Sequence, residues 1–177
     1  MKAAVYDKPG PPSVLRYADV PDPVCGPEDV LIAVEAISIE GGDLINRRSV
    51  PQRSSWIVGY AAAGTVAAIG ENVRDRAVGQ RVTAFNMDGS HAELWAVPAS
   101  RTWPIPQGLD TMRAAATPIG FGTARHCITT RGGLASGETV LIQGAAGGVG
   151  LAAVQIARQV GATVIAVASG HERQARL

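Results

Sequence analysis

The sequence contains few cysteines, few aromatic residues and no excess charge of one sign. Its two cysteines, Cys25 and Cys127, are too far apart for a CxxC pair and too few for a disulfide framework, which favours a reducing compartment. The net charge of +1 gives no indication of nucleic-acid binding, which needs a basic footprint. Long apolar runs are missing throughout, including at Met1–Asp7, where a signal peptide would have one. We therefore expect a cytoplasmic protein with no nucleic-acid partner and no membrane partner.

Hydrophobic residues make up 46% of the 177 residues, and up to about Pro106 they occur in short strand-like runs. Clusters of Gly, Pro and Asp separate these runs, as turns separate strands. The predicted strands are Lys2–Tyr6, Val30–Ala36, Thr65–Ile69, Arg81–Phe85 and Ala92–Val97. Strands spaced this closely indicate a small barrel or sandwich, and we assign residues 1–110 to this first domain.

From about Asp110 the pattern becomes helical and then alternates between strand and helix. Thr111–Ala116 predicts a short helix that Pro118 stops, and Thr123–Thr130 predicts a second helix that ends at two glycines. We assign residues 111–177 to a second domain.

A strand–helix–strand unit follows in this second domain. Thr139–Gln143 is an almost wholly apolar strand, typical of a parallel sheet covered on both faces. Val149–Val160 carries an apolar stripe at helical spacing, and Gly161 stands where a C-cap glycine belongs. Thr163–Ala168 is the second apolar strand, so the unit is predicted to be a right-handed βαβ crossover.

The loop between the first strand of this unit and its helix reads GAAGGVG, Gly144–Gly150. Glycines in such a loop allow a tight turn and let a pyrophosphate approach the backbone, where the helix N-terminus offers unpaired N–H groups. The loop therefore predicts a dinucleotide site, with a glycine turn needed only for strand–helix packing as the alternative. The predicted cofactor-binding residues of the loop are Gly144, Ala145, Ala146, Gly147, Gly148 and Val149.

The end of the second strand of the unit selects the cofactor. NAD-specific sites place an acidic residue there to bind the ribose 2′-hydroxyl, whereas this sequence continues with Ser169 and, shortly afterwards, Arg173. Because Arg173 can pair with a 2′-phosphate, we predict NADPH rather than NADH. The alternative is that Arg173 is a solvated residue of the next helix.

The order of these segments resembles the medium-chain dehydrogenase/reductase superfamily, and within it the zinc-free quinone oxidoreductase-like branch. The stretches that carry the resemblance are Gly41–Arg47, Val58–Val66, Gly79–Val82, Gly122–Ala124 and Gly137–Gly150. It implies an α/β plus β fold, in which a GroES-like β-barrel domain precedes an incomplete Rossmann unit. It also implies hydride transfer from NADPH to a quinone or an activated alkene.

Four candidate site residues follow from the resemblance. It places Thr123 near the nicotinamide and Asp43, Asn46 and Tyr60 near the substrate cleft. Helix capping or turn formation is the alternative for Asp43 and Asn46. Packing in the core is the alternative for Tyr60.

The sequence departs from the zinc-dependent relatives at the positions of their metal ligands. Glu40 and Tyr60 stand where those relatives carry a Cys and a His, and the three histidines show no metal-ligand spacing. We therefore expect no metal. Ala61 and Gln80 also replace a Glu and an Asp that are usual in the family.

The resemblance also concerns length, because members of the family continue well beyond the position of Leu177. We expect a truncated piece of a reductase that is weakly active or inactive by itself. Two alternatives remain, a short form that pairs with another copy and an inactive module that binds a partner. The family usually forms dimers, so a homo-oligomer is expected.

Overall fold

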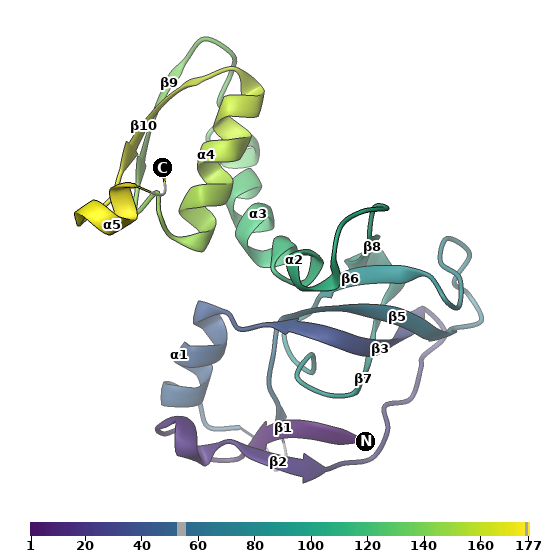
Figure 1. Ribbon diagram of the computed structural model, residues 1–177. Helices are drawn as coiled ribbons and strands as arrows, with labels where there is room; N and C mark the ends of the chain where they lie inside the picture. The colour runs from purple at the N-terminus through teal and green to yellow at the C-terminus, as the bar shows by residue number, and fades with distance from the viewer. Residues whose placement is uncertain (53–55, 176) are drawn as a thin grey trace. The chain divides into compact units, whose positions relative to one another are not determined.

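The computed structural model describes residues 1–52, 56–175 and 177. They form two compact units, Met1–Pro118 and Ile119–Leu177 (Figure 1). The boundary between the units lies later than residue 110, because the short helix α2 (Thr111–Ala115) packs on three strands of the first unit. These are β3 (Asp29–Ser38), β5 (Ala61–Ile69) and β6 (Arg81–Phe85).

Two antiparallel sheets build the first unit. One has five strands in the order β7-β3-β5-β6-β8, and the other has three in the order β2-β1-β4. An isolated bridge between Ala3 and Ala92 joins them. The strands are β1 (Lys2–Tyr6), β2 (Arg16–Asp19), β3 (Asp29–Ser38), β4 (Trp56–Ile57), β5 (Ala61–Ile69), β6 (Arg81–Phe85), β7 (Leu94–Pro98) and β8 (Thr102–Pro104).

The core of the five-stranded sheet follows from alternation along its strands. Successive side chains of a strand point to opposite faces, so every second residue of β3 turns inward. Val30 and Ile32 are 0% exposed for this reason and pack with Val66, Val82 and Val97 of the neighbouring strands. The β-rich first domain is therefore as predicted.

β3 begins one residue before and ends two residues after its predicted bounds, Val30–Ala36, and the strand predicted over Thr163–Ala168 ends at Val167. Two further strands begin at least two residues away from their predicted starts. β5 begins at Ala61 rather than Thr65, since its first residues are small and carry little hydrophobic signal, yet they pair with both β3 and β6. A Cβ on Gly64 would lie 2.0 Å from the Ala33 carbonyl oxygen, so the close approach of β5 to β3 at this position requires glycine. β7 begins at Leu94 rather than Ala92, because Ala92 pairs with the other sheet.

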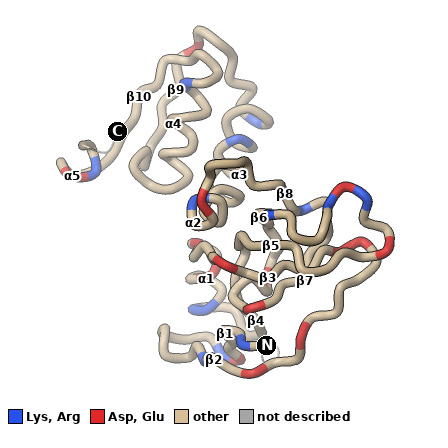
Figure 2. The backbone as a smooth tube through the Cα atoms, turned by 45° about the vertical axis from the view of Figure 1, so that its right-hand side comes forward, with Lys and Arg blue, Asp and Glu red and all other residues tan. Residues whose placement is uncertain are grey.

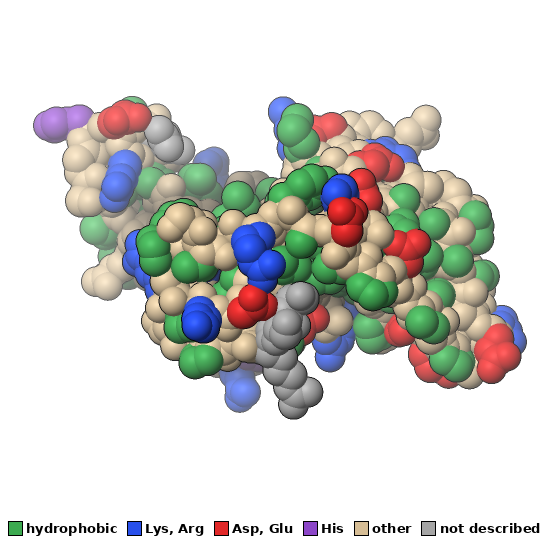
Figure 3. Space-filling view, turned by 90° about the horizontal axis from the view of Figure 1, so that it is seen from below, with side chains coloured by type: hydrophobic (Ala, Val, Ile, Leu, Met, Phe, Trp, Pro, Cys, Tyr) green, Lys and Arg blue, Asp and Glu red, His purple; other side chains and the backbone are tan. Residues whose placement is uncertain are grey.

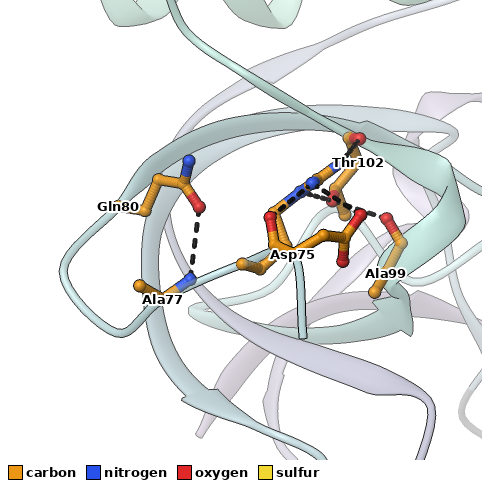
Figure 4. Close-up of polar contacts among 6 residues, drawn as sticks. Asp75, Ala77, Gln80, Ala99 and Thr102 are labelled. Atoms are coloured by element: carbon orange, nitrogen blue, oxygen red, sulfur yellow. Dashed lines mark hydrogen bonds and ion pairs between the residues drawn. The ribbon is translucent and has the colours of Figure 1, made fainter. Parts of the chain in front are cut away.

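Gln80, which replaces the usual Asp of the resembled family, has a local role in the turn before β6 (Figure 4). Its side-chain oxygen accepts a hydrogen bond from the Ala77 N–H at 3.2 Å. Beside it, the Arg76 guanidinium donates through Nε to the Thr102 hydroxyl at 2.8 Å and pairs with Asp75. The amide of Gln80 thus stabilises the turn.

Two helices depart from the expectations. α1 (Gly41–Ser49) was not predicted, because its first two residues are glycines and its apolar residues lack a clear helical period. The predicted helix Thr111–Ala116 is present as α2, which ends at Ala115, before Pro118. The second helix, predicted over Thr123–Thr130, begins earlier, because Pro118 lies in the first turn of α3 (Thr117–Arg125). Proline is tolerated there, where its missing N–H would have no partner in the helix. The chain then continues as a π-helical segment, His126–Arg131.

The second unit contains the predicted parallel βαβ element. β9 (Thr139–Gln143) pairs in parallel with β10 (Thr163–Val167), and α4 (Gly148–Val160) connects them. Gly161 has φ of +88° and ends α4, as predicted. α5 (His171–Gln174) follows β10. The buried residues of the hydrophobic core of this unit are Ala124, Ile142, Ala145, Ala152, Ala153 and Ala157.

Charged residues of both signs are distributed along the chain (Figure 2). On the face shown in Figure 3, basic, acidic and hydrophobic side chains are likewise interspersed. Among the helices of the described residues, none is long and apolar enough to cross a membrane.

Candidate functional site

Asp43 lies in the first turn of α1, close to the end of β3. Its Oδ2 accepts a hydrogen bond from the Glu40 N–H at 2.8 Å, which satisfies a donor at the helix N-terminus. The capping role considered for Asp43 is therefore present. The side chain is only 8% exposed, which is unusual for a residue whose sole task is to cap a surface helix.

Burial raises the pKa of the Asp43 carboxyl above its ordinary value, because desolvation disfavours the charged form. Hydrogen bonds from the backbone of Glu40 and Gly59 and the nearby charge of His91 act in the opposite direction, and they are smaller. The carboxyl therefore retains its proton to a higher pH than a solvated aspartate.

Asn46 and Tyr60 form a hydrogen-bonded pair beside Asp43. The Asn46 Nδ2 donates to the Tyr60 hydroxyl at 2.7 Å, and Asn46 follows Asp43 by three residues on the same side of α1. The Tyr60 ring lies against Gly42, where a Cβ would come within 2.2 Å of Tyr60 Cε2. Tyr60 is half-buried and not part of the main core cluster.

The structure thus brings Asp43, Asn46 and Tyr60 together around one small cavity of about 10 Å³. Its further lining residues are Tyr6, Trp56, Val58, Gly59 and Met87. The sequence did not single out Tyr6, which belongs to β1, because only the folded chain brings β1 next to α1.

Apolar side chains are exposed close in sequence to this polar cluster. Ile39 precedes α1, and Leu44 and Ile45 lie on α1 next to Asp43. Met87, which lines the cavity, is also exposed. The combination of a few converging polar groups with exposed apolar side chains is typical of small-molecule sites.

In the second unit, the glycines of the GAAGGVG loop occupy distinct positions. Gly144 has φ of +67°, so it makes the tight turn after β9. A Cβ on Gly150 would lie 2.3 Å from the Gly144 carbonyl oxygen, so Gly150 allows close packing of α4 on the loop. A Cβ on Gly148 would meet nothing within 4 Å, which leaves space above the first turn of α4.

This arrangement fits a pyrophosphate. The N–H groups of Gly148 and Val149 lie in the first turn of α4, where they have no acceptor within the helix. Both residues are exposed, as are Gly144 and Gly147, whereas Ala145 is buried and Ala146 half-buried. The Ala145 N–H donates to the Val167 carbonyl at 3.0 Å, so the end of β10 lies beside the loop.

The other predicted cofactor residues are exposed. Ser169 follows β10, and Arg173 is on α5. Thr123 is on α3, also exposed. The roles predicted for these three residues stay predictions. Within residues 1–52, 56–175 and 177, no group of three or more His, Cys, Asp or Glu side chains could hold a metal ion.

The known proteins to which this chain is similar agree with the family suggested by its sequence motifs. Residues 26–107 match the alcohol dehydrogenase GroES-like domain. The acryloyl-coenzyme A reductase of Sulfurisphaera tokodaii is 29% identical, over 98% of this chain and 60% of that protein. Human quinone oxidoreductase is 33% identical, over 98% of this chain and 54% of that protein.

Among solved structures, the mycobacterial protein Rv1454c complexed with NADPH superposes with a TM-score of 0.91 at 33% identity. The match covers 99% of this chain and 55% of that one. The chain therefore spans between about half and three fifths of the length of these proteins. The expected fold, a GroES-like domain followed by part of a Rossmann domain, is confirmed.

The contact between Gly42 and Tyr60 can be tested with two neighbouring glycines. Gly42→Ala should displace the Tyr60 ring and lower the free energy of unfolding by about 1–3 kcal/mol, the usual range for overpacking. Gly41→Ala, one residue earlier, adds a Cβ that meets nothing within 4 Å. This variant should change the free energy of unfolding by less than about 1 kcal/mol. Equilibrium unfolding in urea measures both, and equal losses would contradict the described packing.

Proposed function

Because the chain belongs to the medium-chain dehydrogenase/reductase superfamily, we propose that it is part of an NADPH-dependent reductase of quinones or activated alkenes that works without zinc. The observation that carries the proposal is the division of roles among Gly144, Gly148 and Gly150. Gly144 makes the turn, Gly148 leaves open space above the helix N-terminus, and Gly150 allows close packing of α4. Dinucleotide-binding loops need this arrangement.

The cofactor would be held by the backbone of Gly144–Val149 at the N-terminus of α4. When bound, NADPH supplies the hydride. The preference for NADPH over NADH rests on residues 168–170, Ala-Ser-Gly, which offer no carboxylate to the ribose 2′-hydroxyl. Ser169 and the exposed Arg173 are available for a 2′-phosphate.

The polar cluster of the first unit is proposed as the substrate site. Reduction of a quinone or an enone moves an electron pair onto an oxygen atom, so hydrogen-bond donors near that oxygen stabilise the transition state. The Tyr60 hydroxyl accepts from Asn46, and its own proton can therefore be donated to the substrate. The exposed Ile39, Leu44 and Ile45 suit an apolar substrate body.

We propose that the protein works without zinc, because of the side chains at the positions of the zinc ligands. In the resembled zinc enzymes a Cys and a His stand at the positions of Glu40 and Tyr60. The Glu40 carboxylate accepts from the Ser38 hydroxyl at 2.7 Å, and Tyr60 is paired with Asn46. These side chains do not make the thiolate–imidazole set that a catalytic zinc site requires.

A cytoplasmic homo-oligomer is also part of the proposal. Leu141 and Ile165 are partners in the parallel pair β9–β10 and remain 57% and 52% exposed. Contiguous exposed apolar side chains of this kind are typical of association surfaces. Sedimentation velocity should show a dimer or larger species for the wild type and a shift toward monomer for Leu141→Lys, and a monomeric wild type would refute the association.

Cofactor choice is tested by fluorescence titration with NADPH and with NADH. The wild type should bind NADPH more tightly, and Arg173→Gln should weaken NADPH binding about tenfold, the loss of one charge-assisted contact, while leaving NADH binding unchanged. Arg158→Gln, another exposed arginine near the far end of α4, is the control and should change neither affinity. If the wild type bound NADH at least as tightly as NADPH, the proposed preference for NADPH would be refuted.

A further inference from the structure

Tyr6 is a fully buried residue whose hydroxyl group has no protein partner. Its side chain is 0% exposed, and within the described part of the chain no atom forms a hydrogen bond with its Oη. A buried hydroxyl without a partner is costly, and in most such cases an ordered water supplies the missing bond. Strand β1 could carry Phe here at no loss of packing, so the hydroxyl requires an explanation.

The cavity that Tyr6 lines has the size and the polarity of a water site. Its volume is about 10 Å³, close to the lower limit for one water molecule. Asp43, Asn46 and Tyr60 line the same cavity, so it has four polar side chains around it. Empty cavities in proteins are apolar, whereas a cavity with two to four polar partners holds water.

The donors and acceptors of these side chains also match one water molecule. The Tyr60 hydroxyl accepts from Asn46 Nδ2 at 2.7 Å, which leaves its proton to be donated. The Tyr6 hydroxyl has both a proton and lone pairs to share. A water molecule can donate to one of these hydroxyl groups and accept from the other.

We infer that this cavity binds a single water molecule, held by the Tyr6 hydroxyl, and that this water returns a proton to Tyr60 during reduction. The first half of the inference depends on the cavity alone. The second half deepens the proposed function and rests on it.

The proton step balances as follows within the proposed reaction. Hydride forms a new C–H bond on the substrate, and the broken π bond leaves its electron pair on the substrate oxygen. The Tyr60 O–H bond breaks as its proton joins that oxygen, and the water gives one of its protons to the Tyr60 oxygen. One proton from the solvent then restores the water, so each turnover consumes one hydride and one proton. Tyr6 acts in this step as a positioning residue.

The water site is tested by removing single hydroxyl groups. Tyr6→Phe keeps the ring in the core and should lower the Tm by about 2–4 °C, because a satisfied buried hydrogen bond is lost. Tyr17→Phe is the control, since Tyr17 is 74% exposed, and its Tm should stay within about 1 °C of the wild type. An unchanged or higher Tm for Tyr6→Phe would overturn the water site, because removing an unsatisfied hydroxyl does not destabilise.

The proton step is tested by measuring kcat in the complete reductase of which this chain is proposed to be a part, with 1,4-benzoquinone and NADPH as the probe reaction. Tyr6→Phe should lower kcat about tenfold and change the solvent deuterium isotope effect on kcat, with the KM for NADPH unchanged, since general acid catalysis is impaired and cofactor binding is not. A lowered Tm with unchanged kcat would overturn the proton step and support the water site. Absence of turnover in the complete wild-type reductase would refute the proposed function and the proton step, while the Tm comparison would still decide on the water.

Discussion

The candidate site of the first unit depends on the buried carboxyl group of Asp43. This group accepts the Glu40 N–H at the start of α1 and a backbone hydrogen bond from Gly59, just before β5. The Asp43 side chain thus connects the N-terminus of α1 with the residues that precede β5. Asn46, on the next turn of α1, then reaches Tyr60, the residue after Gly59. The Asp43 and Asn46 contacts thus connect the two segments that line the cavity.

Glycines make room for the functional side chains in both units. The Tyr60 ring occupies the space beside Gly42, and a Cβ on Gly59 would lie 2.2 Å from atoms of Ser90 and His91. In the second unit, Gly150 lets α4 approach the loop that begins at Gly144. At each of these glycines a neighbouring group lies where a Cβ would otherwise be, so any larger residue at that position would collide with it.

The sequence predicted the features that depend on local pattern. Short apolar runs between turn-forming clusters located β1 and β6, and the apolar strand, glycine loop and helical stripe located the βαβ unit. Features that depend on tertiary contact were not predicted. α1 has little helix signal and is held by the Asp43 contacts, and Tyr6 looks like an ordinary strand residue until β1 is placed beside α1. The start of α3 was predicted too late, at Thr123, because proline disrupts the interior of a helix but is accepted in its first turn, where Pro118 lies.

The buried state of Asp43 is tested most directly by the pH dependence of unfolding of the wild type and Asp43→Asn. The raised pKa of Asp43 means that, from its ordinary value of about 3.8 up to its folded value, the native state binds more protons than the unfolded state. The stability of the wild type relative to the non-titrating Asn variant should therefore be greatest at low pH and fall as the pH rises through this window. A difference that stays constant, or that grows as the pH rises, would contradict a carboxyl group whose burial outweighs its hydrogen bonds.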